Sequence, residues 1–303
     1  MSQPDLRYQD GHFFTEVLQW APQDTTTISA QVIIIPGNPG LGQIYSEYGA
    51  FLREYLDSSV AITVLSHLGQ HEKTPYSTTF FSLEDQIRHK LWFIDELSTR
   101  TPVYVIGHSI GAHMAVEMMR QNRKQVHGVL GLFPFLQFDE DSRHQCRMRS
   151  LVNSQLAVSC VARLMDALAL LPGWMQAGSL SRFFAPENSP AANKIVMTNL
   201  FQNSAALRQA TFLAVHEFID LAREPDWNFL HEVAPMVKFV FTPDDHWGPL
   251  WMHRKVQEKV PNLASHVMEH VSHSFCTKTE EARVVAKRTA DLLKEMMEQG
   301  IGM

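Results

Sequence analysis

Residues 102–119 read PVYVIGHSIGAHMAVEMM, with a serine that has a glycine two residues away on each side. The apolar, β-branched residues before Gly107 predict a buried strand, and the residues after Gly111 have helical spacing. Gly107 to Gly111 fit the pattern G-x-S-x-G, which predicts a sharp strand-to-helix turn that holds Ser109 in a strained conformation. Ser109 is therefore a candidate nucleophile, and an ordinary turn is the alternative. We expect both glycines because a Cβ at either would collide with the neighbouring strand or helix.

Short apolar runs alternate with amphipathic stretches along the rest of the chain. The apolar runs predict buried strands of a mostly parallel sheet at residues 31–37, 60–66, 102–109, 128–134 and 236–242. Helical spacing occurs near residues 43–57, 83–98, 109–122 and 278–297, and Ser82 is placed to cap the second helix. Between about 135 and 232, helical patterns follow one another. The sequence predicts a single domain over residues 1–303 with the α/β-hydrolase fold, a mostly parallel doubly wound sheet and a helical cap insertion at about 135–232.

The composition excludes several classes of protein. With 303 residues, of which 45% are hydrophobic and 10% aromatic, the chain can bury a large core, so disorder is not expected. The net charge of −6 and the lack of a Lys/Arg cluster argue against nucleic acid as a partner. Cys146, Cys160 and Cys276 lack C-x-x-C spacing and suit a reducing compartment. With no signal pattern and no window of about 18 apolar residues, we expect a soluble or peripherally bound intracellular protein without a cofactor.

An acyl-transfer serine also needs hydrogen-bond donors for the oxyanion. The backbone N–H of Ile110, directly after the serine, is one candidate. The loop IIIPGNPGLG at residues 33–42 follows a predicted buried strand and can supply the other. In this loop Asn38 offers an N–H whereas Pro39 has none, so Asn38 is the predicted second donor. A plain Gly/Pro-rich turn is the alternative for this loop.

The base and its orienting acid should follow the serine in the chain order Ser, Asp, His. PDDHWGP, residues 243–249, follows a predicted strand and offers Asp244 and Asp245. VMEHVSHSF, residues 267–275, places His273 in a loop before the last helix. We predict that His273 takes the proton of Ser109 and that one of the two aspartates fixes the tautomer of His273.

HVMEH at residues 266–270 matches the H-x-x-E-H pattern of a class of zinc proteases. That chemistry requires both histidines on one face of a helix and a third ligand on a later element. Here the stretch precedes the His273 loop, so it is expected to be the last strand of the sheet. No metal site is predicted.

Six segments together resemble the lipid droplet-associated hydrolases. They are IIIPGNPG, TVLSHLGQH, LEDQIRHKLWFI, VIGHSIGAH, GLFPF and DDHWGP with the later SHSF, and they run in order from about residue 30 to 280. The resemblance implies a triad of Ser109, Asp245 and His273, and so favours Asp245 over Asp244. Thr242 stands where members of that family usually have glycine. His67 and His71 of the second segment either line the site or pack its turn, and packing is the favoured role.

The resemblance implies a serine hydrolase of lipid esters that works on lipid droplets and the endoplasmic reticulum, with a weak cholesteryl esterase activity. One alternative is a largely non-catalytic lipid-droplet protein that uses the hydrolase fold for lipid binding or droplet organisation. Another is a soluble carboxylesterase of small esters. An intact set of serine, histidine and acid favours the enzyme, because a binding module needs none of the three.

Residues 151–175, LVNSQLAVSCVARLMDALALLPGWM, indicate how such a protein could reach lipid. As a helix, most of this stretch is apolar, with one polar stripe of Gln155, Ser159, Arg163 and Asp166. The two charged residues argue against a membrane span, whereas Trp174 suits an interface. We expect part of this helix to dock on a lipid surface. A cap helix packed entirely on the protein is the alternative.

Overall fold

The computed structural model describes residues 5–9, 13–21, 28–71, 79–97, 101–170 and 187–300. Its centre is an eight-stranded sheet with the order β1-β2-β4-β3-β5-β6-β7-β8. Strands β3 to β8 run parallel, whereas β1 and β2 are antiparallel to their neighbours. The strands are β1 Asp5–Gln9, β2 Phe13–Trp20, β3 Ala30–Ile35, β4 Val60–Leu65, β5 Val103–His108, β6 Val126–Leu132, β7 Val237–Phe241 and β8 Ala264–Val267.

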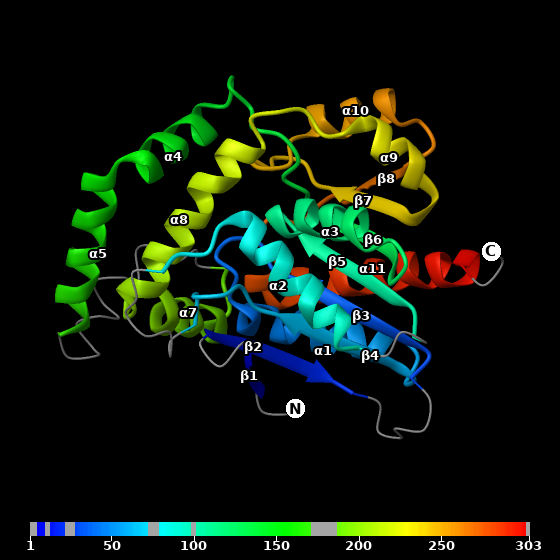
Figure 1. Ribbon diagram of the computed structural model, residues 1–303, viewed down its shortest axis with the longest axis horizontal. Helices are drawn as coiled ribbons and strands as arrows, with labels where there is room; N and C mark the ends of the chain where they lie inside the picture. Colours follow the sequence, from blue (N-terminus) through cyan, green and yellow to red (C-terminus); the bar gives the residue numbers. More distant parts are fainter. Residues whose placement is uncertain are drawn as a thin grey trace.

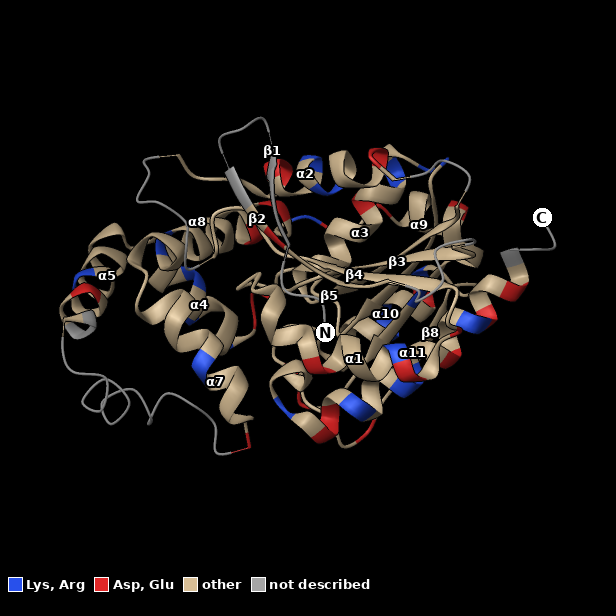
Figure 2. Ribbon diagram, turned by 90° about the horizontal axis from the view of Figure 1, so that it is seen from below, with Lys and Arg blue, Asp and Glu red and all other residues tan. Residues whose placement is uncertain are grey.

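The central strands are apolar on both sides because helices cover both faces of the sheet. Every residue of β3, AQVIII, and of β5, VYVIGH, is buried. Valine and isoleucine suit such strands because their branched side chains pack well on a pleated surface. One face carries α2 Leu83–Asp95, α3 Ile110–Gln121, α9 Trp227–Val233 and α10 Leu250–Lys259. The other face carries α1 Ser46–Tyr55 and α11 Thr279–Gly300. Figure 2 shows the sheet edge-on between α2 and α3 on one side and α1 and α11 on the other.

A group of helices between β6 and β7 projects from one end of the sheet. Figure 1 shows this group on its left, with α5 farthest from the strands. We call α4 and α5, which form its outer part, the α4–α5 arm. The group consists of α4 Arg143–Asn153, α5 Gln155–Ala169, α7 Pro190–Val196, the π-helical turn η3 Met197–Phe201 and α8 Ser204–Asp220. No helix within the described ranges is both long enough and apolar enough to cross a membrane.

The observed elements confirm the predicted fold and add two strands to it. Each predicted strand and helix is present, with ends that move by a few residues, and β8 overlaps the stretch expected to be the last strand. Ser82 caps α2 as predicted, and Asp85 completes a capping box in which side chain and backbone satisfy each other. Strands β1 and β2 were not predicted. Between β6 and β7 the described residues form helices and loops and contain no strand, as expected for a helical insertion, whereas its limits at about 135 and 232 stay a prediction.

Candidate active site

Ser109 lies in the turn between β5, which ends at His108, and α3, which begins at Ile110. Its φ of 55° and ψ of −122° are rarely adopted by a residue with a Cβ. Both flanking glycines are required, as predicted. A Cβ on Gly107 would come within 2.2 Å of the carbonyl oxygen of Gly111, and one on Gly111 within 2.4 Å of that of Ile35. The turn is thus compressed between strand and helix, as in a strained nucleophile turn.

The loop after β3 lies beside this serine. A Cβ built on Gly37 would be 3.1 Å from Cβ of Ser109, so the loop passes the serine at van der Waals distance. The predicted donors Asn38 and Ile110 therefore belong to two segments that meet at Ser109, one following β3 and one opening α3. The peptide bond between Asn38 and Pro39 is cis.

Asp245 and His273 lie together, although 28 residues separate them in the chain. Nδ1 of His273 is 2.8 Å from Oδ2 of Asp245, and the other carboxylate oxygen accepts a 2.8 Å bond from the N–H of Trp247. The side chain of Asp245 is 0% exposed and that of His273 is 20% exposed. Asp244 is exposed, and its φ is 58°. Of the two aspartates, Asp245 is thus the one in contact with the histidine.

Two side chains outside the predicted set hold the loop that leads to His273. Thr242, fully buried at the end of β7, donates a 2.6 Å hydrogen bond to the carbonyl oxygen of Val271. Oε2 of Glu281 accepts bonds from the N–H and the hydroxyl of Ser272, at 2.7 and 2.6 Å. The threonine that departs from the resembled family therefore has a defined structural role.

A histidine and a tyrosine that the sequence did not single out lie directly behind these groups. The His108 ring packs against the His273 ring, with a centroid distance of 4.8 Å. Nε2 of His108 is 2.9 Å from the carbonyl oxygen of His273, and Nδ1 is 2.6 Å from the hydroxyl of Tyr45. That hydroxyl also accepts a 2.9 Å bond from the N–H of Gly37. Only the position of His108 beside Ser109 could have drawn attention to it.

Glu217 of α8 contacts the candidate oxyanion loop and was also missed. Its Oε1 accepts a 2.8 Å bond from Nδ2 of Asn38. Burial raises the pKa of Glu217 to about 8. Because the residue lies in the middle of a helical insertion, no local pattern connects it with Asn38.

His67 and His71 occupy the interior of the turn after β4, which agrees with the packing role favoured for them. His67 is 1% exposed, and its ring fills the space that a Cβ on Gly40 would need. His71 is 5% exposed, and its Nε2 lies 3.5 Å from Oε1 of Glu16. The neighbouring Lys90 donates to the carbonyl oxygen of Ser66, so the segments SHLGQH and QIRHKL pack on each other.

As expected, His266 and His270 do not lie together on one face of a helix. His266 is on β8 and its Nδ1 lies 3.3 Å from Arg288, whereas His270 is in the exposed turn after the strand, with a φ of 62°. The described residues contain no group of three or more His, Cys, Asp or Glu that could hold a metal ion.

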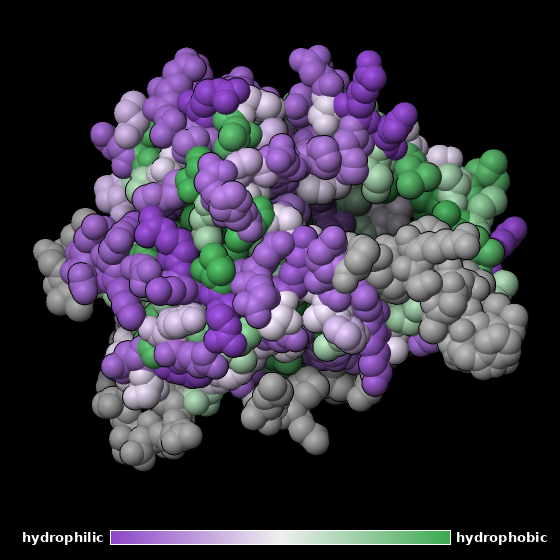
Figure 3. Space-filling view, turned by 180° about the vertical axis from the view of Figure 1, so that it is seen from behind, coloured by the Kyte–Doolittle hydropathy of each residue, from purple (hydrophilic) through white to green (hydrophobic). Residues whose placement is uncertain are grey.

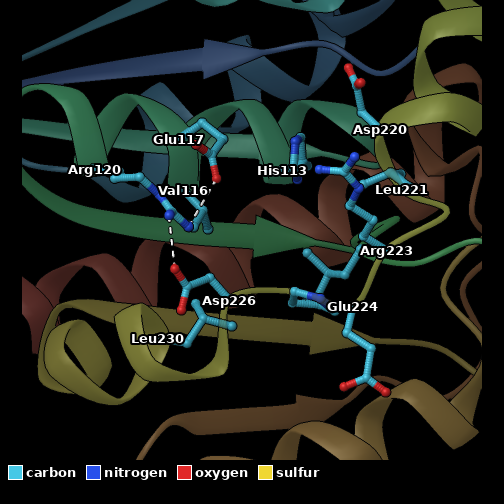
Figure 4. A pocket seen from close by; sticks show the side chains of 12 residues that line it. His113, Val116, Glu117, Arg120, Asp220, Leu221, Arg223, Glu224, Asp226 and Leu230 are labelled. Atoms are coloured by element: carbon cyan, nitrogen blue, oxygen red, sulfur yellow. Dashed lines mark hydrogen bonds and ion pairs between the residues drawn. The ribbon is translucent and has the colours of Figure 1, made fainter.

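A cavity of about 290 Å³ lies along α3, and its lining includes none of the residues discussed so far. Figure 4 shows that Arg120 pairs with two acidic side chains of the lining, Glu117 and Asp226. Arg120 bonds to Asp226 at 2.9 Å and to Glu117 at 3.2 Å. Burial lowers the pKa of His113 to about 4, so that residue is uncharged. These internal pairs make the cavity a poor candidate for the reaction site.

The residue types around Ser109 are those that acyl transfer requires. This reaction uses a hydroxyl nucleophile, an imidazole base, a carboxylate that orients the imidazole, and N–H donors for the oxyanion. Candidates for all four roles converge on the carboxyl ends of β3, β5 and β7 and on the loop after β8. In open α/β sheets this is the edge at which ligands bind.

Comparison with known families and curated proteins gives a consistent answer. A model of the family described as lipid-droplet associated hydrolase matches residues 29–276. The lipid droplet-associated hydrolase of Drosophila melanogaster is 23% identical over 300 residues, which cover 90% of this chain and 93% of the relative. The human protein of the same name is 23% identical over 296 residues, which cover 88% and 86% of the two chains.

Solved structures share the fold with much lower sequence identity. A carboxylesterase from Nitrososphaera gargenis has a TM-score of 0.68 at 14% identity, covering 97% of this chain and 100% of the other. Haloalkane dehalogenase DatA from Agrobacterium tumefaciens also has a TM-score of 0.68 at 14% identity, with coverage of 98% and 96%. These two enzymes are named for different reactions, so the likeness establishes the α/β-hydrolase fold and leaves the reaction to the site.

Proposed function

Because this chain belongs to the lipid-droplet associated hydrolase family, we propose that it is a serine hydrolase that cleaves lipid esters through Ser109. The observation that supports this most is the 2.8 Å contact between Nδ1 of His273 and the buried carboxylate of Asp245. Burying an aspartate is costly unless it is paired and hydrogen-bonded. A carboxylate that meets the Nδ1 edge of a partly exposed imidazole leaves Nε2 free to act as a base.

Each residue has a defined role in the proposed reaction. Nε2 of His273 removes the proton from Oγ of Ser109 while that oxygen attacks the ester carbonyl carbon. The resulting oxyanion is stabilised by the N–H groups of Asn38 and Ile110. His273 then protonates the departing alcohol, and a water activated by the same base hydrolyses the acyl-enzyme. Asp245 keeps the Nδ1–H tautomer and stabilises the imidazolium.

The lipid nature of the ester is supported by the family and by the surface of the cap. Curated relatives are named lipid droplet-associated hydrolases. Hydrophobic side chains gather at the end of the molecule formed by the cap helices, on the right of Figure 3. We propose long-chain lipid esters as the substrate class, with cholesteryl esters as weakly hydrolysed members.

The α4–α5 arm is the proposed contact with the droplet or with the endoplasmic reticulum membrane, in a peripheral mode. One side of α5 packs on α8 and buries Ala162 and Met165. The other side leaves Leu156 77% exposed and Leu164 56% exposed, and Leu151 of α4 is 47% exposed. Large aliphatic side chains this exposed on one arm suit insertion into a lipid interface. Trp174 and the rest of 171–175 lie outside the described residues.

A fluorophosphonate probe tests the nucleophile, and a panel of esters tests the substrate class. We expect the wild-type protein to label at Ser109 and Ser109→Ala to stay unlabelled, because an activated hydroxyl attacks phosphorus readily. Turnover should favour long-chain esters, including cholesteryl esters presented in droplets, over short soluble esters. Folded protein that neither labels nor hydrolyses any ester would instead support the non-catalytic droplet protein. A preference for short soluble esters would support the small-ester carboxylesterase.

A further inference from the structure

We infer that Tyr45 and His108 are positioning residues that fix the loop carrying His273 against the turn carrying Ser109. This inference rests on the proposed function, because it assigns a role in the same reaction. Both residues are buried, with Tyr45 2% and His108 5% exposed. They act through their neighbours and are not themselves catalytic.

The direction of each hydrogen bond follows from the partners. The carbonyl oxygen of His273 can only accept, so Nε2 of His108 must carry a hydrogen and donate it. Burial, and secondarily the charge of His273, hold the pKa of His108 well below its ordinary value, so the ring is neutral. Nδ1 is then a bare acceptor, and the hydroxyl of Tyr45 must donate to it. The lone pairs of that hydroxyl remain free for the N–H of Gly37.

This chain of bonds connects three segments that the reaction needs in register. It begins at Gly37, beside the predicted oxyanion donor Asn38, and passes through Tyr45 of η1, Gly42–Tyr45, to the neighbour of the nucleophile. It ends on the backbone of the predicted base itself. Tyr45 is thus hydrogen-bonded both to His108 and to the loop after β3. We call the bonds from Gly37 to His273 the Tyr45–His108 relay.

Aromatic packing keeps the relay in one arrangement. The His108 ring meets Phe133 and Phe275 edge-to-face, with centroid distances of 6.2 and 5.2 Å. The titratable groups that act on the relay residues are His273, Cys276 and Tyr48. Burial raises the pKa of Cys276 to about 12 and that of Tyr45 well above its ordinary value, so both keep their protons. The donor to Nδ1 of His108 is therefore present throughout the working pH range.

Tyr45→Phe tests the relay, and Tyr48→Phe is its matched control. Both tyrosines are buried, both pack edge-to-face on Phe275, and each hydroxyl has a buried partner. The partner of Tyr48 is Oγ1 of Thr289, at 3.0 Å, which lies outside the relay. Both variants should lose some stability. Only Tyr45→Phe should lower the saturating labelling rate of the fluorophosphonate probe, by about 10- to 100-fold, which is typical of a misplaced catalytic group.

Two variants at position 108 distinguish the role of Nε2 as a donor to His273 from the role of Nδ1 as an acceptor for Tyr45. The side-chain amide nitrogen of Gln reaches about as far as Nε2 of histidine, whereas that of Asn reaches only as far as Nδ1. His108→Gln keeps the donor to His273 but loses the acceptor for Tyr45, so it should lose about as much of the labelling rate as Tyr45→Phe. His108→Asn also loses the donor to His273, so it should lose more. The probe concentration at half-saturation should stay unchanged in all variants, because none of these side chains contacts the substrate. Equal losses of labelling rate in His108→Gln and His108→Asn would contradict a donor role for Nε2 of His108.

Hydrogen exchange of the loop 271–277 gives a readout that does not require activity. We expect exchange there to be faster in Tyr45→Phe than in Tyr48→Phe or in the wild type. If the wild type fails to label but this difference is found, the proposed function is wrong and the relay stands as a structural link. If the wild type labels while Tyr45→Phe matches Tyr48→Phe in both rate and exchange, the relay inference is overturned.

Discussion

The side-chain amide of Asn38 donates a 2.8 Å hydrogen bond to Oε1 of Glu217, and this bond joins the loop after β3 to cap helix α8. The same amide donates to the carbonyl oxygen of Ala210, about two turns earlier on the same face of α8, at 2.8 Å. Because burial raises the pKa of Glu217 to about 8, its side chain is an uncharged carboxylic acid at neutral pH. The cap thus contacts the candidate oxyanion loop through a group that ionises under mildly alkaline conditions.

Glu217→Gln should remove a pH dependence from the stability of the fold. The pKa of Glu217 in the folded protein is raised above that of the unfolded chain, which is about 4.3. Its protonated form therefore contributes stability that is fully present below about pH 4.3 and is lost as the pH rises through about 8. Between these values the wild type should lose about 1.4 kcal/mol of unfolding free energy per pH unit relative to the glutamine variant. Urea unfolding of both proteins at pH 5, 6, 7 and 8 measures this slope.

Glu295→Gln provides a control of opposite sign. The hydrogen bond from Lys238 lowers the pKa of Glu295, so its contribution is present above its unfolded pKa and is lost only as the pH falls. Between pH 5 and 8 its difference from the wild type should be constant. A constant difference for Glu217→Gln as well would mean that Glu217 is ionised in the folded protein across this range.

Asp245→Asn should lower the ester turnover number by roughly 10³- to 10⁴-fold, whereas Asp244→Asn should change it little. The amide at position 245 can no longer hold the Nδ1–H tautomer of His273 or stabilise its positive form. Asp244 is exposed, and the carboxylate that contacts His273 is that of Asp245, so the change at 244 leaves the orientation of His273 intact. Steady-state kinetics with one soluble ester compares the two variants. The reverse ranking would move the orienting acid to Asp244.

Thr242→Val should destabilise the fold by about 1–3 kcal/mol, because it leaves the buried carbonyl oxygen of Val271 without its donor. Thr242→Ser keeps the hydroxyl and should recover most of this loss. Chemical unfolding measures both variants, and probe labelling reports whether the His273 loop loosens as well. If the Thr242→Val and Thr242→Ser variants are equally stable, the hydrogen bond to Val271 contributes nothing to stability and the side chain of Thr242 only fills space.

The sequence predicted the sheet well wherever strands are continuous apolar runs. The run at 31–37 and the run at 102–109 correspond to β3 and β5, because strands buried on both faces need such residues. Strands β1 and β2 pair antiparallel at the edge and lack such a run, so periodicity did not detect them. The Asp10-Gly11 pair between them is a common hairpin signal and could have revealed them.

Candidate residues were predictable where chain order and a local motif define them, and unpredictable where contacts are long-range. Ser109 stands in a five-residue motif, and His273 and Asp245 follow in an order that the fold imposes. The bond between Asn38 and Glu217 spans 179 positions in the chain, and that between Tyr45 and His108 spans 63. No periodicity links such pairs, because only the packing of the cap and of η1 on the sheet brings them together.

The exposed side of α5 in the α4–α5 arm should be required for binding to lipid droplets. Leu156, Cys160, Leu164 and Ala167 follow each other at three- and four-residue spacing on the exposed side of α5. Because Leu156 and Leu164 are largely exposed, changing both to aspartate removes apolar contact area without opening the core. We expect the double variant to lose most of its co-flotation with phosphatidylcholine-coated triacylglycerol droplets, since each buried leucine contributes about 1.5–3 kcal/mol to insertion. Labelling of Ser109 in detergent should remain at the wild-type rate.

A control with the same charge change distinguishes the arm from the surface in general. Val267 on β8 and Val284 on α11 are 37% and 51% exposed and lie on the sheet domain, away from the arm. Changing both to aspartate adds the same two negative charges, so it should leave co-flotation intact if the arm is the contact. Should both double variants leave the droplets equally, general charge repulsion explains the loss. Should the Leu156 and Leu164 variant remain bound, α5 makes no essential contact with lipid, because an aspartate pair cannot stay buried in an acyl-chain interface without a large loss of affinity.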